Sequence, residues 1–379
     1  MDSKALLVFF IFSMLQKPLF AQNQPSAQQI SILIGVLPPG KFNAITDVEG
    51  VKVGHFTNIR GESVRTGVTV VLPHAANLFQ EKVPAAVFTG NGFGKLVGST
   101  QIAELGNIES PIVLTNTLSV ATAVNAVVSY TLDQKENEKV QSVNAVVGET
   151  NDGYLNDIRG RHITEEQVLQ AIQTAKSGKV VQGNVGAGTG TVCFGFKGGI
   201  GTASRVLPNT AGGYTVGVLV QTNFGGVLQI DGVPVGKELK KYYLSDALND
   251  SPNGSCMIVV ATDAPLEARN LERMAKRAFL GLAKTGGIAA NGSGDYVIAF
   301  STAPTVRIEH QPKMLSVKTE LLQNDAMSPL FLATIEATEQ AIINSLLAAE
   351  TMKGNNGHVV EALPKEKLVS ILKKYNRYK

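Results

Sequence analysis

Cysteine is scarce in this sequence, with only Cys193 and Cys256 among 379 residues. A fold held together by several disulfides is therefore excluded, even for an exported protein. A single bridge between the two is left open by the sequence. Both cysteines, however, have apolar neighbours in the stretches 192–194 and 256–258. This setting favours two buried, unreactive thiols.

An excess of charge of one sign is also missing. The chain has 34 basic and 31 acidic side chains, and no run of Lys or Arg is long enough to follow a phosphate backbone. We therefore expect no nucleic-acid partner. The length and the 44% hydrophobic content are typical of a globular protein with a core large enough for an enzyme.

The familiar catalytic signatures are absent as well. The five histidines form no H-x-x-x-H pair and no cluster with cysteine, and no serine lies in a G-x-S-x-G motif. The glycine-rich stretches 90–95 and 186–190 match neither the phosphate-binding nor the dinucleotide-binding spacing. We therefore predict no metal ion and no nucleotide cofactor, and Ser-His-Asp hydrolysis is disfavoured.

Glycine, in contrast, is abundant, and its densest cluster places eight glycines in the nineteen positions from 183 to 201. Because glycine loses much conformational freedom on folding, such clusters mark sharp turns or close approaches of the backbone. Two interpretations are equally favoured. The cluster forms tight turns between layers of sheet, or it lines a substrate cleft with backbone amides.

The N-terminal residues have the pattern of an export signal. Lys4 precedes an apolar stretch over residues 5–15, and Leu19-Phe20-Ala21 places a small residue before a polar segment. A membrane anchor is the alternative, but a bilayer span needs about 20 apolar residues and this stretch is shorter. We predict a signal peptide over 1–21, a flexible leader over 22–40 and a single catalytic domain over 41–379. The mature protein is then periplasmic or secreted, with no membrane contact.

Runs of Val, Ile and Thr indicate strands that alternate with helical patterns. The runs are mostly apolar throughout, which is typical of sheets covered on both faces. Expected strands are residues 66–72, 143–148, 214–222, 256–262 and 296–302. Expected helices run from a capping box at Thr164 to about residue 177, from Asp263 and Pro265 to 286–287, and over 331–352, with a further helical pattern over 237–248. We therefore predict one compact domain with layered sheets and outer helices.

One interruption of this pattern stands out. Residues 249–254 form a run of turn residues, and Ser255 follows at the start of a buried strand. Gly254 has no side chain to obstruct attack by the Ser255 hydroxyl on the preceding carbonyl, and glycine tolerates strained dihedrals. If the chain broke before Ser255, the freed α-amine, with a pKa of about 7.7–8.0, would supply the base that a serine nucleophile needs. Alone this pattern is weak, since 253–255 also matches a glycosylation sequon and an ordinary loop.

Five blocks of sequence together resemble one enzyme family. They lie in the family's order between about residues 40 and 302. The family is the DmpA/BapA family of L-aminopeptidase/D-esterases and β-peptidyl aminopeptidases. The blocks are residues 43–55, 148–154, 193–201, 253–266 and 292–295.

The resemblance implies the roles of several residues around the Gly254–Ser255 bond. Ser255 is expected to be the nucleophile both in cleavage of that bond and in substrate hydrolysis. Ser293 and Asp295 match the family's serine and acidic residue near the freed amine, where a carboxylate would orient an ammonium or hydroxyl network. The family often has Glu at the position of Asp295, so whether the shorter acid fully replaces it is left open.

The resemblance also implies donors and a binding group for the substrate. Tyr154 and Asn223 match the family's active-site tyrosine and asparagine, and a phenol and a carboxamide are suitable donors to an oxyanion. Glu149 is a candidate for binding the substrate's amino group, and Asp152 is a nearby alternative.

The fold implied by the resemblance is α+β, a four-layer αββα sandwich similar to N-terminal-nucleophile hydrolases but with different connectivity. It would consist of an α chain, 22–254, and a β chain, 255–379, in a homo-oligomer of αβ heterodimers. The working hypothesis is a self-processing serine aminopeptidase that acts on short peptides, amides or esters. A related amidase or acyltransferase and a non-catalytic periplasmic binding protein are the alternatives. The sequence leaves the preference among L-α-, D-α- and β-amino acids open.

Overall fold

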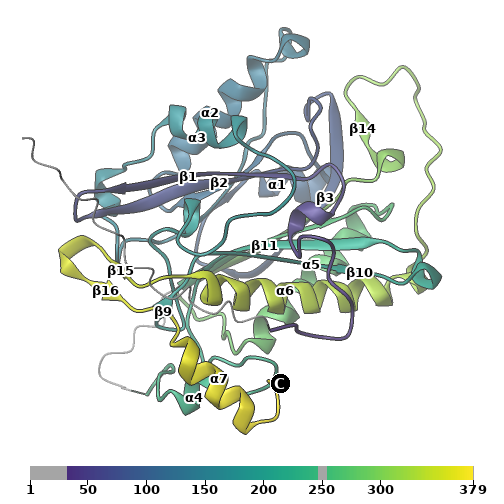
Figure 1. The fold of residues 1–379 in the computed structure, drawn as a ribbon. Helices are drawn as coiled ribbons and strands as arrows, with labels where there is room; N and C mark the ends of the chain where they lie inside the picture. Colours follow the sequence, from purple (N-terminus) through teal and green to yellow (C-terminus); the bar gives the residue numbers. More distant parts are fainter. Residues whose placement is uncertain (1–31, 246–253, 379) are drawn as a thin grey trace, which may run out of the picture. The chain divides into compact units, whose positions relative to one another are not determined.

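The computed structural model describes residues 32–245 and 254–378. The predicted export signal, the first part of the leader and most of the turn-rich run before Gly254 lie outside these residues. The described part is built around two β-sheets (Figure 1). None of its helices is both long enough and apolar enough to cross a membrane.

The first sheet has five strands in the order β1-β2-β6-β7-β4. β6 and β7 are parallel, whereas the other neighbouring strands are antiparallel. The strands are β1 (Lys52–Arg60), β2 (Val64–Leu72), β4 (Leu96–Val97), β6 (Ile112–Asn116) and β7 (Val146–Thr150).

The second sheet has seven strands in the order β10-β11-β12-β13-β3-β14, and β5 also pairs with β3. β12 and β13 are parallel, and the other pairs are antiparallel. The strands are β3 (Glu81–Gly92), β5 (Asn107–Ile108), β10 (Ile200–Val206), β11 (Thr215–Asn223), β12 (Gly254–Thr262), β13 (Ser293–Ser301) and β14 (Ile308–Glu309). Two short hairpins accompany the sheets, β8–β9 (Val192–Cys193, Phe196–Lys197) and β15–β16 (Met352–Lys353, Val359–Val360).

Helices cover the outer face of each sheet (Figure 1). α2 and α3 pack on the first sheet, and α5 and α6 pack on the second. The layers therefore follow the order helix, sheet, sheet, helix, as predicted. The helices are α1 (Ser99–Leu105), α2 (Val120–Leu132), α3 (Glu165–Gln173), α4 (Val235–Glu238), α5 (Ala268–Lys284), α6 (Ser328–Ala348) and α7 (Lys365–Lys374).

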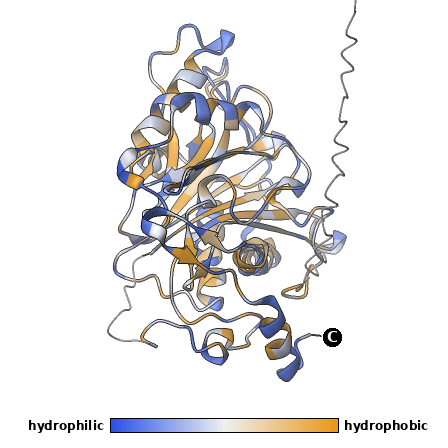
Figure 2. Ribbon diagram, turned by 60° about the vertical axis from the view of Figure 1, so that its left-hand side comes forward, coloured by the Kyte–Doolittle hydropathy of each residue, from blue (hydrophilic) through white to orange (hydrophobic). Residues whose placement is uncertain are grey.

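The main core lies between the two sheets. Leu114 of the first sheet and Met257, Val259 and Ala261 of the second belong to one cluster of buried apolar side chains. Because side chains alternate along a strand, the intervening residues of β12 face the helical layer. All nine positions of β12 are buried, which explains why the sequence shows an apolar run there instead of an alternation. Figure 2 shows hydrophobic residues concentrated on the strands.

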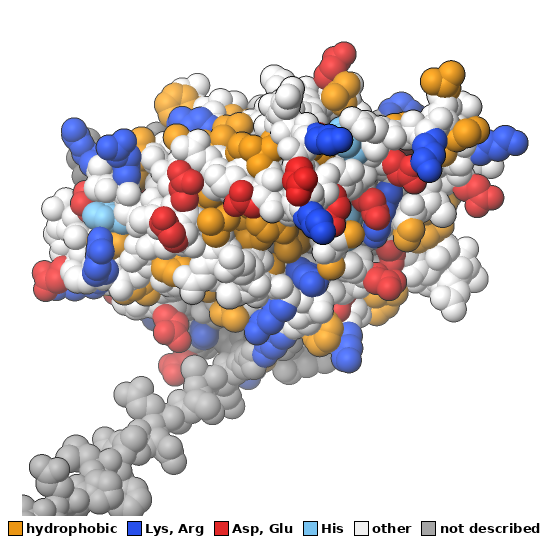
Figure 3. Space-filling view, turned by 90° about the horizontal axis from the view of Figure 1, so that it is seen from above, with side chains coloured by type: hydrophobic (Ala, Val, Ile, Leu, Met, Phe, Trp, Pro, Cys, Tyr) orange, Lys and Arg blue, Asp and Glu red, His pale blue; other side chains and the backbone are white. Residues whose placement is uncertain are grey.

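The charged side chains are mixed on the surface. On the face shown in Figure 3, basic and acidic groups are interspersed, in keeping with the near balance of 34 and 31 such residues. Both cysteines are free and buried, so the interpretation as two buried thiols is confirmed. Burial raises the pKa of the Cys193 thiol to about 12 and raises that of the Cys256 thiol as well. Both thiols are therefore held in the unreactive, neutral form.

Several predicted boundaries differ from the observed ones. α5 begins at Ala268 instead of Asp263. Glu267 is the N-cap, and its carboxylate accepts a hydrogen bond from the Arg269 amide at 2.9 Å. The Asp263 carboxylate accepts one from the amide of Thr215 instead, 2.8 Å away on the neighbouring strand. The capping box at Thr164 is confirmed, but its helix ends at Gln173.

The helix predicted over residues 237–248 is wrong in its described part. α4 ends at Glu238, and Lys240 and Leu244 have positive φ values of 54° and 69°. Such backbone is incompatible with a continuing right-handed helix. Residues 246–248 lie outside the described residues.

The predicted leader is also shorter than expected. Residues 32–37 pack against α6, with Ile34 buried and its amide 2.8 Å from the side-chain oxygen of Gln340. The amides of Val36 and Leu37 donate to the two carboxylate oxygens of Glu336. A flexible leader reaching residue 40 is therefore wrong, because these residues already belong to the folded domain.

The glycine cluster forms close packing between segments. A Cβ on Gly188, Gly199 or Gly201 would collide with the backbone of Ile200, Gly183 or Ala341, respectively. These contacts support the first interpretation, in which the cluster lets layers of the fold approach each other closely.

Candidate active site

Three strand ends converge on Ser255. Asn223, the last residue of β11, lies directly opposite Ser255 in the antiparallel pair, and Gly294 lies opposite Ser255 in the parallel pair with β13. The first sheet reaches the same place, because Gly148 of β7 packs on the side chain of Met257, two residues after Ser255. The segment that follows β7, which carries Asp152 and Tyr154, therefore begins near the start of β12.

The Ser255 hydroxyl is buried and has two backbone neighbours. It donates a hydrogen bond to the carbonyl oxygen of Gly254 at 2.6 Å and accepts one from the Gly294 amide at 3.2 Å. The hydroxyl therefore lies against the carbonyl group that it would attack in a cleavage before Ser255. The amide of Gly294 is a donor that the sequence analysis did not identify, since any residue type can supply a backbone amide.

Gly254 is required here for a further reason, the close approach of a neighbouring strand. Its φ is not in the left-handed region, but an added Cβ would lie 2.7 Å from Cα of Phe224 and 2.8 Å from the carbonyl oxygen of Asn223. Real Cβ atoms do not approach other atoms this closely. Glycine is therefore needed because β11 passes beside the bond.

Ser293 and Asp295 lie together on the first residues of β13. The Ser293 hydroxyl donates to Oδ1 of Asp295 at 2.8 Å, while Oδ2 is buried and has no hydrogen-bond partner in the described part of the chain. Burial raises the pKa of Asp295 to about 6, although the hydrogen bond from Ser293 and the nearby backbone of Cys256 act to lower it. The carboxyl group thus lies beside the backbone that follows Ser255, with one acceptor oxygen unused.

Asn223 is held by its side-chain oxygen. This oxygen accepts a hydrogen bond from the amide of Val192 at 3.0 Å. The carboxamide NH₂ is consequently the group that can serve as a donor to a substrate. Val192 belongs to the β8–β9 hairpin, which is thus a support for the site that sequence reasoning missed.

Glu149 is buried on β7 and accepts hydrogen bonds from the Lys95 amide, at 3.1 Å, and from the Thr117 hydroxyl. The ammonium group of Lys95 lies 3.5 Å from the same carboxylate and is half exposed. Glu149 lies near the nucleophile. Gly94 separates its carboxylate from Gly294, the residue paired with Ser255, and a Cβ built on Gly94 would lie 3.1 Å from Cα of Gly294 and 3.3 Å from Oε1 of Glu149.

Asp152, the alternative to Glu149, is occupied within the core. Its Oδ1 accepts a hydrogen bond from Asn156 at 2.9 Å, and burial raises its pKa to about 7. About half of the Asp152 carboxyl groups are therefore neutral at pH 7, which weakens the attraction to a substrate ammonium. The geometry therefore favours Glu149.

Tyr154 follows β7 and is 53% exposed. Its ring stacks on that of His358, with centroids 4.3 Å apart and an interplanar angle of 9°. Nδ1 of His358 lies 2.8 Å from the carbonyl oxygen of Tyr154. His358 comes from the β15–β16 hairpin, far away in sequence, and no local pattern indicates this contact.

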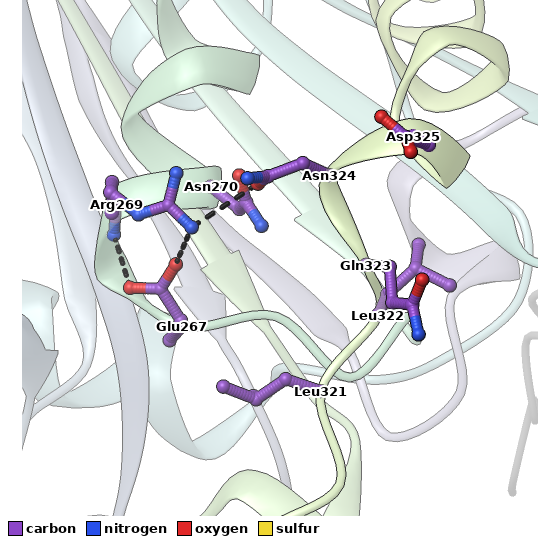
Figure 4. Close-up of a pocket in the computed structure, with 8 residues that line it drawn as sticks. All are labelled: Glu267, Arg269, Asn270, Leu321, Leu322, Gln323, Asn324 and Asp325. Atoms are coloured by element: carbon purple, nitrogen blue, oxygen red, sulfur yellow. Dashed lines mark hydrogen bonds and ion pairs between the residues drawn. The ribbon is translucent and has the colours of Figure 1, made fainter.

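The described cavities lie away from these residues. One, of about 470 Å³, is lined by the start of α5 and the segment before α6 (Figure 4). None of its eight lining residues is among the predicted site residues. Among the described residues, no group of three or more His, Cys, Asp or Glu side chains is arranged to hold a metal ion.

Comparison with known proteins identifies relatives along most of the chain. Residues 43–360 match the model of peptidase family S58. The chain is 45% identical over 360 residues to the β-peptidyl aminopeptidase BapA of Sphingosinicella microcystinivorans, covering 89% of this chain and 90% of that protein. It is 39% identical over 355 residues to BapA of Sphingosinicella xenopeptidilytica, covering 88% of both. The predicted family resemblance is thereby confirmed.

A solved structure agrees with the predicted fold. The L-aminopeptidase D-Ala-esterase/amidase of Ochrobactrum anthropi, described as a prototype for the serine aminopeptidases, superposes with a TM-score of 0.84 at 37% identity. The match covers 92% of this chain and 98% of that one. That structure is described as a new variant among the Ntn hydrolase fold. The prediction of a sandwich similar to N-terminal-nucleophile hydrolases is confirmed.

Proposed function

This chain belongs to peptidase family S58, and we propose that it is a self-processing serine aminopeptidase whose nucleophile is Ser255. The observation that carries the proposal is the position of the Ser255 hydroxyl. It contacts the carbonyl oxygen of Gly254 and the Gly294 amide, and Asn223 lies opposite on the adjacent strand. The relatives include β-peptidyl aminopeptidases, and their names support short peptides with a free N-terminal amine as the substrates.

Self-processing would begin with attack of the Ser255 hydroxyl on the carbonyl carbon of Gly254. The Gly254–Ser255 C–N bond breaks, an ester to the serine oxygen forms, and the nitrogen takes up a proton to become an α-amine. Water then hydrolyses the ester, which leaves a carboxylate on Gly254 and a free hydroxyl and amine on Ser255. The products are an α chain ending at Gly254 and a β chain beginning at Ser255.

In substrate hydrolysis the freed α-amine would act as the base for its own hydroxyl. The Asp295 carboxyl, held by Ser293, lies beside this backbone and would orient the amine. Asn223 and Tyr154 would donate hydrogen bonds to the oxyanion of the tetrahedral intermediate. The acyl group of the substrate passes to the serine oxygen, the amine or alcohol leaves, and water releases the acid.

Glu149 would select substrates with a free N-terminal amine. Its carboxylate is buried close to Gly94 and Gly294, so a substrate ammonium bound there would lie near the nucleophile. A charge-assisted hydrogen bond to such a carboxylate is worth about 1.5–3 kcal/mol. The side-chain ammonium of Lys95 would have to share the carboxylate or move away.

The proposal also includes export and assembly. The pattern around residues 4–21 supports a signal peptide that is removed after Ala21, giving a periplasmic or secreted protein with an α chain of residues 22–254. Assembly into a homo-oligomer of αβ heterodimers is proposed on the family resemblance.

A panel of aminoacyl p-nitroanilides tests the function directly. We expect hydrolysis of compounds with a free amine and none of the same compounds after N-acetylation. Equal hydrolysis of the acetylated compounds would instead identify a general amidase. No hydrolysis of any compound in the panel would contradict the aminopeptidase assignment.

A further inference from the structure

A three-residue turn crosses from one sheet to the other beside Ser255. Residues 93–95 connect the last residue of β3, in the seven-stranded sheet, to the first of β4, in the five-stranded sheet. At one end, Gly92 lies opposite Gly294. At the other end, Leu96 lies opposite Gly148, the residue before Glu149. The turn therefore spans the distance between the nucleophile and the proposed amine-binding carboxylate.

Backbone contacts fix this turn at both ends. The amide of Phe93 donates to the carbonyl oxygen of Ser293 at 3.2 Å, and the amide of Lys95 donates to Glu149 at 3.1 Å. Between them, Gly94 is so close to Gly294 that an added Cβ would lie 3.1 Å from its Cα. The turn is thus held in place through its main chain.

The side chain of Phe93 is 69% exposed, although its backbone is held in place. Complete burial of a phenylalanine side chain is worth about 1.5–3 kcal/mol, so an exposed ring leaves much of this stabilisation unused. Single exposed apolar residues are common on surfaces. Phe93 differs from such residues in its location. The main chain of Phe93 contacts Ser293, and the next residue, Gly94, lies between Gly294 and Glu149.

We propose that the ring of Phe93 packs against the side chain of the substrate's N-terminal residue and selects apolar residues at that position. The inference rests on the proposed function, in which Glu149 binds the amine and Ser255 attacks the carbonyl carbon. The N-terminal residue then lies between these two groups, along the turn that carries Phe93. Its side chain gains apolar contact with the ring, whereas a glycyl substrate has no side chain to make this contact.

The test compares Phe93→Ala and Phe93→Leu with the unaltered protein. The substrates are glycyl, alanyl, leucyl and phenylalanyl p-nitroanilides together with the four corresponding β-aminoacyl p-nitroanilides, all with one leaving group, and the comparison uses whichever series the unaltered protein hydrolyses. We expect Phe93→Ala to lower kcat/KM for the leucyl and phenylalanyl substrates by about 10-fold or more, as apolar pocket contacts do. The glycyl substrate should change by less than about twofold, and Phe93→Leu should be intermediate, because it retains part of the apolar surface.

Phe42→Ala is the matched control. Phe42 is also an exposed phenylalanine, at 39%. It lies away from the site, because its neighbour Asn43 contacts Ser204, near the end of β10 that is farther from Asn223. This variant should leave all four rates unchanged. Each preparation is first checked on a denaturing gel for complete cleavage into two chains, so that impaired processing is not mistaken for altered selectivity.

Two results would overturn the inference in different ways. In the first, the unaltered protein hydrolyses the panel, but Phe93→Ala either lowers all four rates by the same factor or leaves all four unchanged. The ring then does not contact the N-terminal side chain of the substrate. If the unaltered protein hydrolyses no compound of either series, the proposed function itself fails and the inference fails with it.

Discussion

Asn223 and Ser255 lie directly opposite each other, at the end of β11 and the start of β12. The antiparallel pairing of two buried strands fixes this relationship, so it does not depend on a loop. A donor held on a strand can be oriented before the reaction begins, which is the condition for efficient stabilisation of a developing charge.

Replacing Asn223 by Ala should lower kcat by about 10²–10³-fold, because one oxyanion donor is lost. Steady-state kinetics on a leucyl p-nitroanilide would measure the loss. Asn223→Asp distinguishes the causes, since it retains an oxygen for the Val192 amide but has no NH₂ donor. An Asp variant with nearly full activity would show that the contact with Val192, and not the donor, is what matters.

Replacing Gly254 by Ala should slow self-cleavage strongly. The added methyl group would lie 2.7 Å from Cα of Phe224, so the strand must shift away from β11. Gly225→Ala is the matched control, because a Cβ there meets nothing within 4 Å. The fraction of uncut chain after purification, measured on a denaturing gel, should be high for Gly254→Ala and unchanged for Gly225→Ala. Equal cleavage of both variants would show that the close approach is not important.

Replacing Glu149 by Gln should raise KM by about 10- to 100-fold and change kcat little, because a charge-assisted contact with the substrate amine is lost. Glu109→Gln is the control variant, and its KM should stay unchanged. Glu109 is also buried and also bonded to a lysine, Lys82 at 2.6 Å, but it belongs to the β5–β6 connection. An unchanged KM for Glu149→Gln would assign the amine site to another group.

The buried carboxyl of Asp295 predicts a specific dependence of stability on pH. Its pKa is raised from 3.8 to about 6 in the folded chain, so the folded state binds more protons than the unfolded state between these values. Its contribution to stability is therefore fully present below about pH 3.8 and is lost as pH rises from there through about 6. The change amounts to about 3 kcal/mol, at 1.36 kcal/mol for each pKa unit.

Urea unfolding of two uncut variants would measure this contribution. Ser255→Ala is compared with Ser255→Ala/Asp295→Asn, in which the group at 295 no longer titrates. We expect the stability of the single variant relative to the double one to fall between pH 4 and pH 7. A difference that is constant over this range would show that Asp295 has an ordinary pKa.

The buried strands were the easiest part of the fold to predict. β12 and β13 are apolar throughout because both faces are covered, and their predicted limits lie within three residues of the observed ones. Asp263 shows where local patterns fail. Its place before Pro265 is typical of a helix start, but its carboxylate bonds to Thr215, which only the sheet brings near.

In the site, too, some residues could be predicted from the sequence and others could not. Ser255, Asn223, Ser293 and Asp295 were predicted from the family resemblance, and the strand pairing places them side by side. The Gly294 amide, the Val192 amide and His358 were missed. Two of these act through the backbone and the third approaches Tyr154 from a hairpin 204 positions away in sequence, so no local pattern identifies them.

Cleavage of the chain before Ser255 is tested most directly by intact-mass analysis of the purified protein. We predict two chains, the second beginning at Ser255 with a free α-amine, and a single uncut, inactive chain for Ser255→Ala. Two chains in the Ser255→Ala variant, or a single uncut chain in a fully active unaltered protein, would contradict the account.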